Sequence, residues 1–153
     1  MSTPQPASRT RRIRAVLLIG LAAYAVSYFL PATGGAVRLR GWQAAWISLS
    51  AIAHPARVTG PWFGEYLAVL VSGLINPLFL VTCTLALRNP YARTVAVLRI
   101  ALLVMFGACW VVFRAEHATP AAGYFLWIVS MAAALFADKL APPEDQPLGE
   151  PGR

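Results

Sequence analysis

Four long apolar runs dominate the chain, and its charged residues cluster between them and at the two ends. The runs are Ala15–Leu30, Tyr66–Leu87, Thr94–Phe113 and Ala118–Ala137. A helix rises about 1.5 Å per residue, so about 20 apolar residues cross a bilayer core of about 30 Å. The last three runs meet that length. The first meets it if its helix begins near Arg11 and the arginine side chains snorkel outward. The pattern therefore predicts transmembrane helices over roughly 12–30, 64–87, 94–114 and 119–139.

The first run has a second interpretation. Arginines followed by an apolar stretch are also typical of a secretory signal peptide, and Gly34-Gly35-Ala36 could serve as a cleavage site for small residues. The apolar run is longer than the usual core of a signal peptide, so we expect an uncleaved helix. The other three helices would remain in the membrane in either case.

The long connection after the first run contains a segment with helical periodicity, over 41–53. Trp42, Ala45, Trp46 and Leu49 lie at helical spacing on one face. The segment is too short to span a bilayer, which predicts an interfacial or re-entrant helix on the outer surface. This helix would anchor the protein or cover an outward-facing cavity. At the last connection, we expect Pro120 to occupy the first turn of the final helix.

Composition agrees with a membrane location. Hydrophobic residues make up 58% of the 153 residues and charged residues 12%, which leaves too few polar side chains to cover a soluble fold of this size. The predicted fold class is thus all-α, an integral membrane bundle of four transmembrane helices with an extra helix in the first outer loop. The bundle occupies 11–140, between disordered cytoplasmic tails at 1–10 and 141–153.

The net charge of +7 indicates topology rather than binding to nucleic acid, because the basic residues flank the apolar runs. With the N-terminus in the cytoplasm, the inner side holds Arg9, Arg11, Arg12, Arg14, Arg88, Arg93, Arg99, Lys139 and Arg153. The outer side then holds Arg38, Arg40, Arg57 and Arg114. Nine against four predicts a multi-pass protein of the cell inner membrane with both termini cytoplasmic. Arg11, Arg12, Arg14, Arg88 and Arg93 are the expected topology and lipid anchors.

Ionisable residues are scarce inside the predicted spans. Arg99 lies about one and a half turns inside the third helix and is expected to snorkel to the headgroups. In the second helix, Ser72 and Asn76 share a face, and Pro77 predicts a kink. Asn76 would bond a neighbouring helix, or Ser72 and Asn76 would form a binding face for a small molecule beneath Trp42 and Trp46.

The outer loops bring two histidines and two acidic residues to one membrane depth. His54, Glu65, Glu116 and His117 could ligate a divalent metal, although their spacing matches no recognised motif and exposed loop residues are the simpler interpretation. Cys83 and Cys109 are predicted to differ in depth by about 15 Å, too far for a disulfide. The chain contains no motif for catalysis or phosphate binding, so we predict no cofactor and no catalysis.

Several short motifs follow one another in a characteristic order: Leu30-Pro31-Ala32, Gly41-Trp42, Asn76-Pro77 and Gly123-Tyr124-Phe125-Leu126-Trp127. From about residue 12 to 140, the chain resembles a group of small four-helix bacterial inner-membrane proteins that have no assigned activity. This resemblance implies a membrane location and nothing about chemistry.

Three functional hypotheses follow. The leading one is a non-catalytic accessory, assembly or interaction subunit in the lipid bilayer, whose partner is another membrane protein or a second copy of the chain. The alternatives are a small-molecule carrier or binding protein that uses the polar face of the second helix, and a membrane enzyme with an outer His/Glu metal site.

The charge distribution makes a testable prediction. A green fluorescent protein fused to the C-terminus should fluoresce, and alkaline phosphatase at the same position should be inactive, because both report a cytoplasmic end. Phosphatase fused after Arg57 should be active. An active phosphatase at the C-terminus would contradict the predicted orientation.

Overall fold

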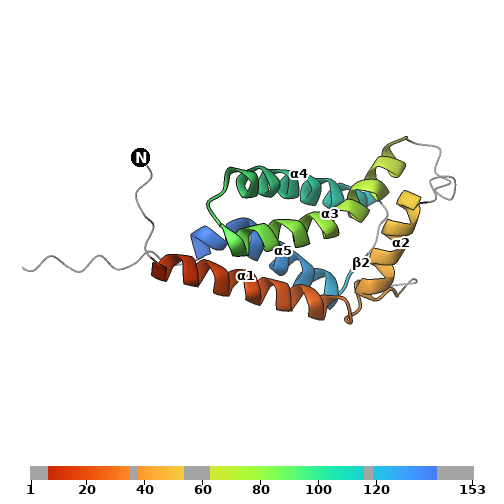
Figure 1. Cartoon of the computed structure of the whole chain (residues 1–153). Helices are drawn as coiled ribbons and strands as arrows, with labels where there is room; N and C mark the ends of the chain where they lie inside the picture. The colour runs from red at the N-terminus through yellow and green to blue at the C-terminus, as the bar shows by residue number, and fades with distance from the viewer. Residues whose placement is uncertain (1–6, 35–37, 54–62, 116–118, 141–153) are drawn as a thin grey trace, which may run out of the picture.

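A computed structural model describes residues 7–34, 38–53, 63–115 and 119–140, and nearly all of them are helical. The elements are α1 (Ala7–Ser27), β1 (Thr33–Gly34), α2 (Gly41–Ala53), α3 (Phe63–Arg88), α4 (Arg93–Ala115), β2 (Thr119–Pro120) and α5 (Ala122–Leu140). The four long helices lie alongside one another, and α2 crosses one end of them (Figure 1). We name this the α2 end, and the end with the α3–α4 connection the turn end. The predicted all-helical class is confirmed.

Two segments of the described chain are long and apolar enough to cross a membrane. They are Arg93–Trp110 in α4 and Ala122–Leu140 in α5. The sequence predicted four spans. In α3, side chains are described continuously only from Gly73, and the described apolar stretch is Gly73–Arg88. In α1, four arginines occupy the first two turns, so its uncharged part is also short.

Helices α1 and α5 form the most extensive helix pair. The buried positions of α1 alternate between steps of four and three: Ile13, Leu17, Gly20, Tyr24 and Ser27. Those of α5 include Gly123, Ser130, Ala134 and Ala137. Such spacing keeps one stripe facing a partner helix along its whole length. A Cβ placed on Gly20 would lie 2.8 Å from the Cβ of Ala133, so small residues set the close approach of the two helices.

The second pair, α3 and α4, uses the same spacing with larger side chains. Its buried residues include Ile75, Phe79, Thr82 and Ala86 on α3, and Val95, Leu102 and Cys109 on α4. The rings of Tyr24 and Phe79 lie 4.6 Å apart and join the two pairs. The core therefore runs along the axis between all four long helices. Figure 1 shows the first part of α3 inclined to the rest, as expected with Pro77 inside the helix.

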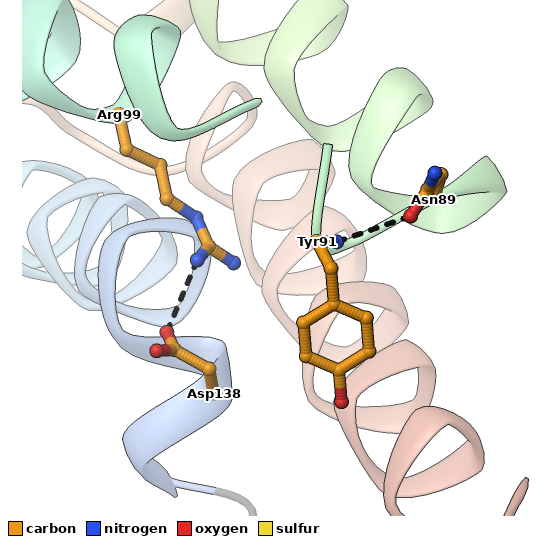
Figure 2. Close-up of polar contacts among 4 residues, drawn as sticks. All are labelled: Asn89, Tyr91, Arg99 and Asp138. Atoms are coloured by element: carbon orange, nitrogen blue, oxygen red, sulfur yellow. Dashed lines mark hydrogen bonds and ion pairs between the residues drawn. The ribbon is translucent and has the colours of Figure 1, made fainter. Parts of the chain in front are cut away.

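A tight turn joins α3 to α4. The backbone N–H of Tyr91 donates to Oδ1 of Asn89 at 3.2 Å (Figure 2), and the N–H of Ala92 donates to the Asn89 carbonyl at 3.3 Å. Pro90 has no N–H to continue the ladder of α3, which therefore ends at Arg88. The short connection makes α3 and α4 antiparallel neighbours.

The bounds of α1 differ from those predicted. The helix begins at Ala7, so residues 7–10 are helical and do not belong to a disordered tail. It ends at Ser27 rather than near residue 30, because a residue before proline disfavours helical geometry and Pro31 follows Leu30. The tail predicted at 141–153 lies outside the described residues.

The start of α5 also differs from expectation. Pro120 lies in β2, where it pairs with Thr33 of β1, and the helix begins at Ala122. The placement of Pro120 in the first helical turn was therefore wrong. The two-residue strands use this part of the chain to join the loop after α1 to the loop before α5. In contrast, α2 has the bounds predicted from its periodicity.

The close contact of α1 with α5 predicts opposite effects for two glycines. Gly20→Leu should lower the free energy of unfolding by about 1–3 kcal/mol, because the side chain has to displace Ala133. Gly107→Leu is the matched control, since a Cβ at this exposed glycine meets nothing within 4 Å. It should be neutral or stabilising by up to about 1 kcal/mol. Denaturant unfolding of the full chain, followed by circular dichroism, measures both; equal effects would contradict the packing.

Candidate functional site

A cavity of about 180 Å³ lies inside the α2 end, between α2 and the long helices. Ala44, Ala45 and Ser48 of α2 form one wall. The other walls include Ser27 at the end of α1 and Tyr28 just after it, Ile75 and Asn76 of α3, Cys109 of α4, and Tyr124 and Trp127 of α5. All four long helices and α2 therefore contribute to one site.

The cavity exists because α2 sits close to its neighbours through small residues. A Cβ on Gly41 would lie 2.8 Å from Cα of Tyr28, and a Cβ on Gly73 of α3 would lie 2.8 Å from the Ser48 carbonyl oxygen. Between these two contacts, α2 presents Ala44 and Ala45, whose side chains are too short to reach the opposite wall. The backbones are thus held in place, and the space between them stays unfilled.

A hydrogen bond between two helices forms part of the cavity wall. Nε1 of Trp127 donates to Oδ1 of Asn76 at 3.0 Å. An indole N–H can donate and cannot accept, so the amide must turn its oxygen to Trp127. The Trp127 ring is held in turn by stacking on Phe106 and Tyr124, with centroids 5.9 Å and 5.6 Å away. The Nδ2 group of Asn76 keeps its two N–H donors for another acceptor.

Hydroxyl groups add further polar atoms to the wall. The hydroxyls of Tyr24 and Tyr28 are 2.6 Å apart, and either can donate to the other. Oγ of Ser27 donates to the Tyr24 carbonyl at 2.6 Å and is thereby occupied. None of the described residues that line the cavity is charged. The site is accordingly a neutral and mainly apolar space with a few polar groups.

Of the binding residues predicted from sequence, the structure places some in the cavity wall and others outside it. Asn76 lines the cavity, whereas Trp42 and Trp46 are absent from its lining and are 49% and 69% exposed. The prediction placed these tryptophans over the site; the stripe that faces the bundle instead contains small residues, which allow closer approach than an indole does. The fourth predicted residue, Ser72, belongs to α3, but its side chain lies outside the described part.

The outer metal site cannot be assembled from the described chain. His54, Glu116 and His117 lie outside the described residues, as does the side chain of Glu65 in α3. Within the described ranges, no three His, Cys, Asp or Glu residues come together as metal ligands. Cys83 and Cys109 are both buried and form no disulfide, as their predicted depths required.

An ion pair lies toward the turn end. Nη1 of Arg99 on α4 contacts Oδ1 of Asp138 on α5 at 3.1 Å (Figure 2). The side chains are 15% and 33% exposed, so Arg99 does not extend to the surface and the expected snorkelling was wrong. The backbone of α5 leaves helical geometry at Phe136, just before Asp138, and the carboxylate lies within reach of the guanidinium. This pair is separate from the cavity lining.

The predicted topology arginines gather at the turn end. Arg11, Arg12, Arg14, Arg88 and Arg93 are all exposed. They belong to the first half of α1, the last residue of α3 and the first residue of α4, which lie at the same end of the bundle in Figure 1. The structure therefore separates this charge cluster from the cavity by most of the length of the helices.

Comparison of the chain with known protein families, curated proteins and solved structures yields no match. The chemistry of the site must therefore be inferred from its own geometry.

Sequence reasoning missed Trp127 as the partner of Asn76. From sequence, Trp127 was considered only as part of the motif Gly123-Tyr124-Phe125-Leu126-Trp127. A signal was present, because an indole N–H in an apolar segment needs an acceptor, and Asn76 is the one side-chain amide within the four apolar runs.

The bond predicts energetic coupling between Asn76 and Trp127. In a double-mutant cycle of Asn76→Ala and Trp127→Phe, the coupling energy should be about 0.6–1.7 kcal/mol, the range for polar contacts between membrane helices. Trp110→Phe is the control, since Trp110 is an exposed tryptophan that stacks on Tyr124, and its coupling to Asn76 should be near zero. The cycle is measured from unfolding free energies. Coupling of equal size in both cycles would refute a specific bond.

Proposed function

We propose that the chain is a multi-pass inner-membrane protein in which all four long helices cross the bilayer. Each of them turns large apolar side chains outward, among them Ile19 at 69% exposure, Leu80 at 44%, Val104 at 67% and Val129 at 58%. A soluble protein of this size would not expose apolar surface on every side. The core helix of a soluble protein would be mostly buried, whereas 17% of Arg93–Trp110 is.

Charge supports the proposed orientation. The exposed arginines of the turn end match the cytoplasmic excess of basic residues that orients membrane proteins, so both termini lie in the cytoplasm. The arginines of α1 extend along the helix to the headgroups, which lengthens its short apolar part. At the other end, α2 lies across the bundle (Figure 1) with Trp42 and Trp46 outward, as in an interfacial aromatic belt.

Within this membrane protein, we assign the cavity the role of a binding site for a small lipophilic molecule. The single observation that carries this assignment is that the cavity reaches Asn76 beneath α2. A dry bundle would have favoured the accessory subunit, which was the leading hypothesis from sequence. The cavity instead supports the alternative, a non-catalytic binding protein or carrier. An apolar cavity of about 150 Å³ accepts benzene in another protein, so a space of about 180 Å³ suits one ring.

Filling the cavity should abolish this binding. In nanodiscs that contain the full chain, the ¹⁹F NMR signal of fluorobenzene should shift and broaden relative to empty nanodiscs. Ala45→Phe, which places a ring in the cavity, should remove the protein-dependent change. Ala96→Phe is the matched control at an exposed position of α4 and should retain it. Ala44→Leu fills the same space with a smaller group if Ala45→Phe does not fold. An unchanged signal in a folded cavity-filled variant would refute the proposed function.

A further inference from the structure

We infer that the cavity beneath α2 selects a neutral, ring-sized molecule bearing a carbonyl-type oxygen, which accepts a hydrogen bond from Nδ2 of Asn76. This inference rests on the proposed function, that the cavity binds a small lipophile, and adds the chemical class of the ligand. Its basis is the direction in which the Asn76 amide is held.

The first step concerns the amide. Trp127 supplies only a donor, so the bond of 3.0 Å between Nε1 and Oδ1 fixes which side of the Asn76 amide faces Trp127. Within the described chain, Nδ2 donates to no protein group, although Asn76 lines the cavity. Asn76 is half-buried, and an N–H group that faces a mainly apolar space gains from an acceptor. An oxygen acceptor in the cavity would satisfy Nδ2.

The second step concerns Tyr28. The Tyr24–Tyr28 pair has two hydroxyl hydrogens and uses one of them for the contact of 2.6 Å between the oxygens. Tyr28 belongs to the cavity wall and Tyr24 does not. Either hydroxyl can donate in this contact, so Tyr28 can offer the cavity a hydrogen or a lone pair. Nδ2 of Asn76 can only donate, and it is therefore the group that favours a ligand that accepts.

The third step concerns charge and shape. No charged side chain lines the described walls, so an ionic ligand would enter without a counter-ion and pay the full desolvation cost. Ile75 and the rings of Tyr124 and Trp127 provide apolar surface for the body of the ligand. A ring with one carbonyl oxygen combines the required size, neutrality and acceptor.

Two ring compounds of similar size test the inference. The probes are 4-fluoroacetophenone, which has a carbonyl oxygen, and 1-ethyl-4-fluorobenzene, which lacks one. Dissociation constants are measured by ¹⁹F NMR titration of the full chain in nanodiscs, after correction for partition into empty nanodiscs. The ketone should bind about three- to tenfold more tightly, the ratio expected for one neutral hydrogen bond.

Variants identify the donor. Asn76→Leu, of similar volume, should make the two affinities equal by weakening the ketone alone. Trp127→Phe keeps the Asn76 amide but removes the hydrogen bond that orients it. This variant should reduce the preference for the ketone without abolishing binding of either probe. It also serves as the second variant if Asn76→Leu does not fold. Ala96→Phe should leave the preference unchanged.

The outcomes separate the inference from the proposed function. Equal affinities of the wild-type chain for both probes, or a preference that persists in Asn76→Leu, would overturn the inference while the binding function stands. If neither probe gives a signal that Ala45→Phe removes, the cavity holds only water or lipid, and both fail.

Discussion

Carbonyl groups of the backbone between α1 and β1 accept hydrogen bonds from the first N–H groups of two other helices. The arrangement of the α2 end depends on these bonds. The first N–H groups of a helix have no partner within that helix. Here Gly41 and Trp42, at the start of α2, donate to the carbonyls of Leu30 and Tyr28 at 3.0 Å each. The N–H of Gly123, at the start of α5, donates to Pro31 at 2.8 Å. In an apolar environment such groups cannot be left unpaired, so one short segment ties three helices together.

This segment, which we call the junction, also explains why a cavity forms beside it. Each hydrogen bond needs close backbone approach, and glycine stands at two of the contact points, Gly41 and Gly123. The junction fixes the height of α2 above the bundle, and the alanines that follow cannot fill the remaining space. The space of about 180 Å³ is partly open, and longer side chains at Ala44 or Ala45 would fill it.

Different interactions stabilise the two ends of the bundle. At the α2 end, backbone hydrogen bonds and small residues hold the elements together, and the cavity lining is neutral. At the turn end, exposed arginines surround the helix termini, and the Arg99–Asp138 pair joins α4 to α5. Breaking a partly buried pair by removing one partner leaves an uncompensated charge, so this contact favours a single pairing of α4 with α5. The cavity and the charge cluster are therefore held together by different contacts.

Local patterns determined much of this protein. The spacing of apolar residues predicted the helices and the range of α2, because helical periodicity is a property of neighbouring residues. It also indicated that Asn76 could bond a neighbouring helix. The placement of arginines predicted which ends lie together. Other features arise from contacts between residues far apart in the chain: the pairing of α1 with α5, the Trp127–Asn76 bond, the Arg99–Asp138 pair and the β1–β2 contact that displaced Pro120 from the helix. The face of α2 that meets the bundle was also decided by tertiary structure. The sequence placed Ala45 on one face with Trp42 and Trp46, whereas close approach to the backbones of α1 and α3 turns Ala44 and Ala45 toward the bundle and leaves the tryptophans exposed.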